Sequence, residues 1–357
     1  MSRLAWMLSR MIVLRFLAIL IGLSLFVLSL EIVAYSREIT AIGEGSTVGV
    51  LHYILLRAPN VMATFLPMCL LLAILLTITE LSYRNELTAI WSMGISPFRV
   101  IAMLTPMALL AGALHVVLLD RAVPAAAPTL RDWGIGDYGQ KKLNLAENDP
   151  LWLRSGTDIM RAAGASDDSR VLTNVIIFKR DDRGLLLQQI FADRAERKQE
   201  QWHLTGVTIY ERENTPPRRM ATALYGGDMR PALAGTRSGD PEELTSGELR
   251  YFSVNEGFGI RPAYVYETAL QRRITPALVP LIMLALCIPL AARFRRGGGL
   301  GILFAAGVGL GFGFFVFDGF SQSFGELGLV PPWMAAWTPL FVFTMIAAYM
   351  TLRTERV

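Results

Sequence analysis

Six long stretches with almost no charged residues constrain this chain more than any other feature of its sequence. Residues 16–36 carry one charged side chain, Glu31, and the other five stretches carry none: 58–79, 100–119, 274–292, 297–317 and 327–352. A bilayer core of ~30 Å needs roughly 20 helical residues, so each stretch is long enough to cross a membrane. Buried helices of a soluble protein are the alternative, and six such stretches disfavour it. The sequence therefore predicts an integral membrane α-helical bundle of six transmembrane helices.

The charged residues are concentrated between the third and fourth of these stretches. Of the 64 charged residues, 40 lie between residues 130 and 270, and the 19 basic side chains nearly cancel the 21 acidic ones. Such a balance argues against a nucleic-acid-binding domain. We therefore expect a soluble domain at 121–270, inserted between residues 1–120 with helices one to three and residues 271–357 with helices four to six.

The positions of the arginines predict the orientation of the chain in the membrane. With the N-terminus inside, the short cytoplasmic segments contain ten arginines: Arg3, Arg10, Arg15, Arg84, Arg99, Arg293, Arg295, Arg296, Arg353 and Arg356. The opposite side has Arg37 and Arg57 in its first loop and none between residues 318 and 332. Because short cytoplasmic loops are rich in Lys and Arg, both termini are expected in the cytoplasm and the inserted domain outside it.

The inserted domain reads as all-β. Residues 171–179 and 185–193 are rich in β-branched and apolar residues, and the Asp182-Arg183-Gly184 sequence between them favours a hairpin connection. Residues 202–212 predict another strand, and residues 150–163 predict two more. No helical periodicity of useful length is apparent between 140 and 265. A sandwich, a jelly-roll-like fold and a twisted open sheet all remain possible.

Two further features of the membrane part concern packing. Residues 46–56 predict a short helix that lies on the membrane surface after an external loop. In the fifth stretch small residues recur every four positions, and Gly307 and Gly311 form a second pair. The recurring residues are Gly301, Ala305, Gly309 and Gly313. Such spacing lets another helix approach closely, either for tight packing within the bundle or at a gate that opens.

Nothing in the sequence predicts catalysis by this chain. It has no phosphate-binding glycine loop, no serine-hydrolase elbow, no metalloprotease motif and no cysteine pair with metal-ligand spacing. Polar residues at membrane boundaries are more informative. Glu31 and Arg37 lie at the outer end of the first helix and Asp318 at that of the fifth. They are expected either to sit at the interface or to line an outward cavity for a polar head group.

The segment RNELTAIWSMGIS, residues 84–96, predicts a short helix between the second and third membrane stretches. Asn85 is a suitable N-cap, and Gly94 and Pro97 end the helix. Leu87, Ile90 and Trp91 fall on one face. A helix this short is unstable alone in water, so it is expected to lie on the membrane surface or in a groove of a cytoplasmic partner.

The acidic residue followed by MGIS at 93–96, together with FLPM at 65–68, resembles the LptF/LptG permease family of lipopolysaccharide export. Residues 317–340 are also similar, and Asp318 with Pro331-Pro332 looks most like the LptG branch. The resemblance covers nearly the whole chain, with its six helices and one inserted β domain.

This resemblance implies a permease subunit of an ABC transporter in the bacterial inner membrane. Such a subunit extracts lipopolysaccharide from the outer leaflet of the inner membrane and passes it to a periplasmic bridge. The implied partners are an LptF-like second permease, an LptB-like ATPase dimer, and LptC-like and LptA-like bridge proteins. ATP is then used by the ATPase subunit, and this chain binds no cofactor. The inserted domain corresponds to a periplasmic β-jellyroll. A non-transporting membrane scaffold or sensor, whose β domain binds a periplasmic partner, is the alternative.

The resemblance also assigns roles to residues. Segment 84–96 becomes the coupling helix, with Glu86 at the acidic position of the family. Helices one and five become the lateral gate. The expected ATPase-coupling residues are Arg84, Glu86, Leu87, Ile90, Trp91 and Gly94. The expected residues of the substrate cavity and gate are Glu31, Arg37, Gly301, Ala305, Gly309, Gly313, Asp318 and Phe320. One departure is that SLEIVAYSREI offers only Arg37 where LptG-type members carry several basic residues for lipid A phosphates. Phosphate recognition then falls to Arg37 and the partner, or the lipid A is less phosphorylated.

Overall fold

A computed structural model of the chain describes residues 3–41, 46–135, 138, 151–155, 157–165, 171–198, 201–211, 216–226, 240–254, 262–293 and 300–355. Arg295, Arg296 and Arg356, which contributed to the predicted orientation, lie outside these residues. The chain divides into two compact units, Met1–Ala126 with Thr268–Val357, and Ala127–Glu267. The sequence placed the corresponding boundaries at 120/121 and 270/271, a few residues away in each case. The observed boundaries fall within two helices, α6 (Val123–Trp133) and α9 (Ala263–Gln271).

The first unit is helical. Its elements are α1 (Arg3–Ala34), α2 (Ser36–Ala41), α3 (Ser46–Tyr83), α4 (Glu86–Ser92), α5 (Pro97–Val117), the π-helical η1 (Leu118–Ala122), the 3-10 helix η3 (Thr275–Ala277), α10 (Val279–Arg293), α11 (Leu300–Glu326) and α12 (Pro332–Glu355). Among the described residues, five helices are long and apolar enough to cross a membrane. A sixth span requires that residues 263–277 and 279–292 count together, although they bend by 48° at a short break. The predicted membrane bundle is therefore confirmed, with five spans or six.

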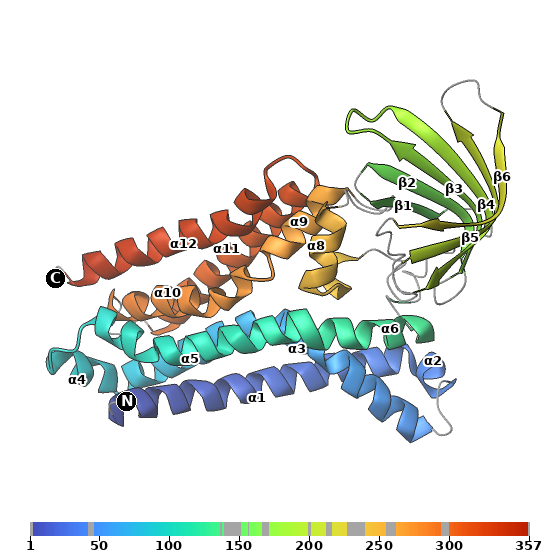
Figure 1. Cartoon of the computed structure of the whole chain (residues 1–357). Coiled ribbons are helices and arrows are strands. Elements are labelled where there is room, and N and C mark those ends of the chain that lie inside the picture. The colour runs from blue at the N-terminus through green and yellow to red at the C-terminus, as the bar shows by residue number, and fades with distance from the viewer. Residues whose placement is uncertain are drawn as a thin grey trace. The chain divides into compact units, whose positions relative to one another are not determined.

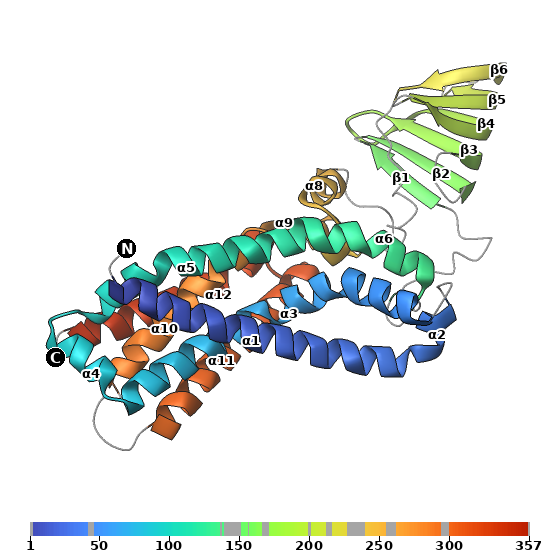
Figure 2. The same cartoon turned by 90° about the horizontal axis from the view of Figure 1, so that it is seen from below.

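Helix α3 packs against both α1 and α11 in this unit (Figures 1 and 2). A Cβ atom added at Gly307 or Gly311 would overlap the side chain of Leu75 or Leu71 on α3, so these glycines allow α11 to approach α3 closely. Helix α10 packs against α3, α5 and α12. Both termini and α4 lie at one end of the unit, called here the terminal end, and α2 lies at the opposite end (Figure 1).

Two helix boundaries predicted from the sequence are wrong. Residues 46–56 do not form a separate surface helix, because they are the first turns of α3, which continues through Pro59 and Pro67. A membrane helix tolerates proline where its neighbours satisfy the freed carbonyl groups. The third helix does not end at Asp120, because the π-helical turn η1 connects α5 to α6. Arg273 donates a hydrogen bond to the carbonyl of Leu119 within η1, which gives this irregular turn a side-chain partner.

The second unit contains one antiparallel sheet in the sequential order β1-β2-β3-β4-β5-β6. Its strands are β1 (Leu151–Ser155), β2 (Asp158–Ala165), β3 (Val171–Arg180), β4 (Leu186–Lys198), β5 (Gln201–Glu211) and β6 (Arg218–Tyr225). The five predicted strands are confirmed, as is the hairpin at Asp182-Arg183-Gly184, where the Gly184 N–H donates to the Asp181 carbonyl. Strand β6 was not predicted. The expectation of no helix was wrong for α8 (Ser246–Val254), whose buried residues are only Leu249 and Phe252.

Three neighbouring strands of this sheet are irregular at the same level. Their buried residues are spaced by three positions instead of two, in the pairs Leu172/Val175, Ala192/Ala195 and Leu204/Val207. The strands nevertheless keep a constant register, because Leu172 pairs with Ala195 and Ala195 with Leu204. Asn174 and Gly206 have φ angles of 48° and 68° at this level. The pairing is interrupted at this level and resumes in the same register on both sides, so the irregularities of the three strands are matched.

A hydrogen bond across the sheet shows how strongly it curls. The Tyr225 hydroxyl of β6 donates to a carboxylate oxygen of Asp158 in β2 at 2.8 Å. In a flat sheet these strands would be about 19 Å apart, four spacings of ~4.8 Å. The curled sheet buries Trp202 and Tyr225 on its inner face. Of the three architectures that the sequence allowed, the described strands form the open sheet, and its sequential order is not the Greek key of a true jelly roll.

Candidate functional site

Helix α4 lies at the terminal end of the helical unit (Figure 1). Asn85 precedes it, but in a left-handed conformation with φ of 58° and without the predicted side-chain cap. Gly94 ends the segment with φ of 77°, a conformation that glycine adopts without strain. Pro97 then begins α5, and the Ser96 hydroxyl accepts a hydrogen bond from the Arg99 N–H at 3.4 Å. Tight turns at both ends therefore fix a helix of only 7 residues.

The apolar face of α4 packs on the chain's own core. Leu87 and Ile90 are buried and Trp91 is partly buried against the same cluster of residues. These three side chains line a small cavity together with Leu8 and Ile12 of α1. The sequence predicted that this face meets the membrane surface or a partner, and the structure places it inside the bundle. The reason is that α1, α3 and α5 provide a closer apolar surface than any external one.

The opposite side of α4 is exposed. It presents Glu86, Ala89, Ser92 and Met93, and Arg84 just before the helix is 61% exposed. Among the predicted coupling residues, Arg84, Glu86 and Gly94 are therefore accessible to a partner. Leu87, Ile90 and Trp91 instead anchor the helix. The anchoring and the accessible residues alternate along one short helix, so α4 is both fixed to the bundle and open to a partner.

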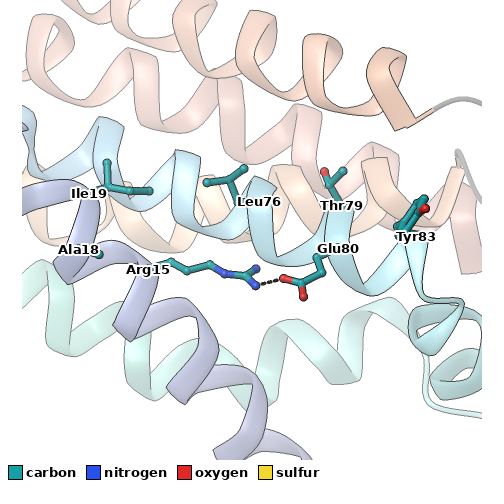
Figure 3. Close-up of a pocket in the computed structure, with 7 residues that line it drawn as sticks. All are labelled: Arg15, Ala18, Ile19, Leu76, Thr79, Glu80 and Tyr83. Carbon is teal, nitrogen blue, oxygen red and sulfur yellow. Dashed lines mark hydrogen bonds and ion pairs between the residues drawn. The ribbon is translucent and has the colours of Figure 1, made fainter. Parts of the chain in front are cut away.

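An ion-pair network connects α1, α3 and the turn between α3 and α4. Glu80 of α3 pairs with Arg15 of α1 and with Arg84, whose Nη2 atom lies 2.8 Å from a carboxylate oxygen of Glu80. Arg15 and Glu80 meet at a groove of about 510 Å³ between α1 and α3, with Thr79 and Tyr83 nearby (Figure 3). This network was not predicted from the sequence. A signal was present, since Arg15 and Glu80 each border one of the uncharged stretches.

Glu31 of α1, which was expected at the membrane interface or at a cavity, is paired with α3, and its role at a substrate cavity stays a prediction. Arg57 of α3 donates two hydrogen bonds to the Glu31 carboxylate, from Nη2 to Oε1 at 2.9 Å and from Nε to Oε2 at 3.0 Å. The Tyr53 hydroxyl donates to the same carboxylate at 3.0 Å. Arg37 is exposed on α2 and has no ion pair with any described residue. The negative charge of Glu31 is thus compensated, and Arg37 keeps its charge available.

Asp318 of α11 is also paired. Arg272 donates to its two carboxylate oxygens at 2.9 and 2.8 Å, which is the bidentate geometry of a strong ion pair. Phe320, two residues later, is 61% exposed. Asp318 therefore fixes α11 to the segment before α10, whereas Phe320 remains available for contact with a ligand or another chain.

The small residues of α11 divide between two faces. Gly307 and Gly311 face α3, as described above. A Cβ atom added at Gly301, Gly309 or Gly313 would meet no atom within 4 Å, and Ala305 is exposed. The predicted four-residue ladder therefore faces away from this chain's own described helices. Its role at a gate stays a prediction, although its surface is open to a second chain.

The described residues contain no group of three or more His, Cys, Asp or Glu side chains that could hold a metal ion. The two cysteines, Cys69 and Cys287, are buried in α3 and α10 and are not bonded to each other. The polar side chains described above are engaged in ion pairs between helices or exposed at helix surfaces.

Comparisons with known proteins agree with these features. A family profile described as "Lipopolysaccharide export system permease LptF/LptG" matches residues 6–353. Two curated proteins named "Lipopolysaccharide export system permease protein LptG", from Escherichia coli K12 and from Escherichia coli O6:H1, are each 24% identical to this chain over 357 residues. The alignment covers 95% of this chain and 95% of each relative.

Proposed function

The chain belongs to the LptF/LptG family of lipopolysaccharide export permeases, and we propose that it is the LptG-like permease subunit of an ATP-driven lipopolysaccharide exporter. In this proposal the chain extracts lipopolysaccharide from the outer leaflet of the inner membrane. It then passes the lipid to a periplasmic bridge of LptC-like and LptA-like proteins. Energy comes from an LptB-like ATPase dimer, and this chain itself hydrolyses nothing.

The observation that carries the proposal is the two-sided structure of α4. Its apolar residues Leu87 and Ile90 are buried in the bundle, so a force applied to the helix acts on the membrane helices. Its other side presents Glu86 to solvent. A rigidly anchored helix with an exposed carboxylate at its N-terminal end suits docking to a basic groove of an ATPase subunit.

The proposed orientation places both termini and α4 in the cytoplasm and the β unit in the periplasm. It rests on the arginine distribution, which favours the cytoplasm for short loops rich in Arg. Within the β unit, β1 and β6 are the outer strands of an open sheet. An outer strand has unpaired backbone groups, which can pair with a strand of a bridge protein.

The proposed second permease subunit, LptF-like, packs on the exposed face of α11. Gly301, Gly309 and Gly313 leave that face without side chains, and close helix approach in a membrane uses such surfaces. Arg37 is the exposed cation available for a lipid phosphate at the α2 end. We expect the partner subunit to supply the remaining positive charge.

The test is reconstitution in proteoliposomes with a second permease and an ATPase subunit. Glu86→Lys should reduce ATP-dependent release of lipopolysaccharide by roughly tenfold or more, because it places a like charge against a basic groove. Membrane insertion should be unchanged. Glu38→Lys is the matched control, since Glu38 is an exposed carboxylate on α2 at the opposite end.

Two results would argue against the proposal. Release that continues undiminished in the Glu86→Lys variant would exclude α4 as the coupling element. Export that continues in cells depleted of this chain would favour the alternative of a scaffold or sensor.

A further inference from the structure

The two long helices α1 and α3 are connected by charged side chains at two separated places. One is the pair of Glu31 with Arg57, whose side chains are 20% and 14% exposed. The other is the pair of Arg15 with Glu80, whose side chains are 27% and 32% exposed. Between these places α1 packs on α3 through apolar residues such as Phe16 and Leu20. Each ion pair joins one side chain of α1 to one of α3, so the two pairs define the register of α1 against α3 together with the apolar packing between them.

The two places differ in what else they contact. Glu31 and Arg57 are completed by Tyr53 and Asn60, all of which lie on α1 or α3. Glu80 instead pairs with Arg84 as well, and Arg84 lies two residues before α4. One carboxylate therefore contacts a residue of α1 and, four residues further along its own chain, the first residue of the turn that connects α3 to α4. Tyr83 and Glu80 also line the groove shown in Figure 3.

Apolar packing reinforces this arrangement. Leu8 and Ile12 of α1 line the same small cavity as Leu87 and Ile90 of α4. A displacement of α4 is therefore transmitted to α1 through both the apolar contact and the charged contact. The apolar contact resists compression and separation, and the charged contact specifies where α1 stands along α3.

We propose that Arg15, Glu80 and Arg84 form a positioning network that transmits displacement of α4 to α1, with Glu80 as its centre. The proposal rests on the function proposed above, because it assumes that an ATPase subunit moves α4. None of the three residues contacts substrate in this proposal. Arg15 is central to it, since Glu80 is its one polar partner among the described residues.

The network can be interrupted without leaving Glu80 unpaired. Arg15→Gln removes the connection to α1 while Arg84 still neutralises Glu80. Arg84→Gln removes the contact of Glu80 with the turn that leads to α4, while Arg15 remains. Each single variant should therefore fold and insert normally. The readout is lipopolysaccharide released per ATP hydrolysed in proteoliposomes with the second permease and the ATPase subunit.

We expect Arg15→Gln to lower this ratio by about three- to tenfold, the range for residues that couple two sites. ATP hydrolysis itself should continue, because the ATPase subunit still binds α4. Arg99→Gln is the matched control, since Arg99 is an exposed arginine near the start of α5 that no described residue pairs with. It should leave the ratio unchanged.

Two further variants separate positioning from simple stabilisation. In Arg15→Glu/Glu80→Arg/Arg84→Glu all three charges are inverted and both ion pairs are kept, so the ratio should recover substantially. In a cycle that combines Arg15→Gln with Glu86→Gln, the effects should be less than additive, because both changes interrupt one path. Additive effects, or no recovery on inversion in a variant that inserts normally, would overturn the network.

The outcomes also separate this inference from the proposed function. If the wild-type complex shows no ATP-dependent release, the proposed function fails. If the wild-type complex releases lipopolysaccharide and Arg15→Gln keeps the wild-type ratio, only the positioning network fails.

Discussion

Helices α4 and α11 each pack one face on the chain's own core and expose the other, but the sequence signal lies on opposite faces in the two helices. In α4 the apolar pattern of Leu87 and Ile90 marks the buried face. In α11 the longer small-residue ladder, which includes Gly301 and Gly309, marks the exposed face, and the shorter pair Gly307 and Gly311 is buried against α3.

The difference shows which kind of contact an apolar pattern and a glycine pattern each indicate. Burial of an apolar side chain away from water lowers the free energy of the folded chain, so an apolar face packs on the nearest apolar core. A glycine gains nothing by burial and only removes bulk, so a glycine face is equally compatible with a neighbour in the same chain and one in another chain. The residues available for partners therefore differ in kind, with polar residues around Glu86 on α4 and small residues on α11.

The largest expected effect concerns the buried face of α4. Ile90→Ala should lower the free energy of unfolding by about 2–4 kcal/mol, because it removes buried methyl groups and leaves a cavity. Ala89→Lys, one residue earlier on the exposed face, should change stability by no more than about 0.5 kcal/mol. Thermal unfolding of the purified chain in detergent measures both. Equal losses of stability would mean that the two faces of α4 are not distinct.

The next comparison tests the two faces of α11. Gly311→Leu should cost about 1–3 kcal/mol, because the new side chain overlaps Leu71 on α3. A Cβ atom at Gly309 would meet no atom within 4 Å, so Gly309→Leu should leave the isolated chain as stable as the wild type. The Gly309→Leu substitution should instead reduce co-purification with a second permease subunit. If Gly309→Leu assembles normally, the exposed ladder is not the surface for that subunit.

The same inward and outward comparison applies to β6, where Tyr225 is buried and Leu224 is exposed. Burial, together with the hydrogen bond to Asp158 and its negative charge, raises the pKa of Tyr225 above its ordinary value of 10.0. The folded β unit therefore favours the neutral phenol. Its contribution to stability is complete below pH 10 and is lost as the pH rises above that value.

Tyr225→Phe should lower stability at neutral pH by about 1–2 kcal/mol through the lost hydrogen bond and should reduce the loss between pH 9 and 11. Leu224→Thr is the control and should retain the wild-type pH dependence. Limited proteolysis between residues 201 and 225 of the full chain measures the opening of the sheet. An unchanged alkaline loss in Tyr225→Phe would assign that loss to other groups.

The smallest effect is expected at Arg84. Its side chain is 61% exposed, so Arg84→Gln should change stability by no more than about 0.5 kcal/mol. This variant sharpens the comparison because it should alter lipid release per ATP without altering the melting temperature. A clear loss of stability would show that Arg84 belongs to the anchoring side of α4 rather than to its accessible side.

The fold was predictable from the sequence wherever one local pattern dominated. Uncharged stretches located the membrane helices, and β-rich segments located β1 to β5. Strand β6 was missed because its sequence, RRMATALY, begins with two arginines and has little alternation. Helix α8 was missed because it is short and buries only two side chains, Leu249 and Phe252. The extensions of α3 and α5 were missed because the uncharged stretches 58–79 and 100–119 cover only part of each continuous helix.

The candidate site was predictable by position but not by face. The sequence placed α4 and identified Glu86, Arg84 and Gly94, which the structure leaves accessible. It could not show that Glu31 pairs with Arg57 or Asp318 with Arg272, because these partners are 26 and 46 residues apart. An ion pair depends on where two side chains meet in space, and sequence separation carries no information about that.

The sequence by itself determined that this is a membrane protein with an inserted β unit, because hydrophobic length and strand pattern are properties of continuous segments. It also determined which residues could contact partners. Only the tertiary structure decided which of these residues are instead engaged in contacts within the chain. Glu80 pairs with Arg15 and Arg84, Tyr225 reaches Asp158 across the three intervening strands, and the apolar face of α4 packs on the chain's own core. Apart from the pair of Glu80 with Arg84, each of these contacts joins segments that are distant in the chain. Which segments pack together depends on the whole folded structure and not on any one segment.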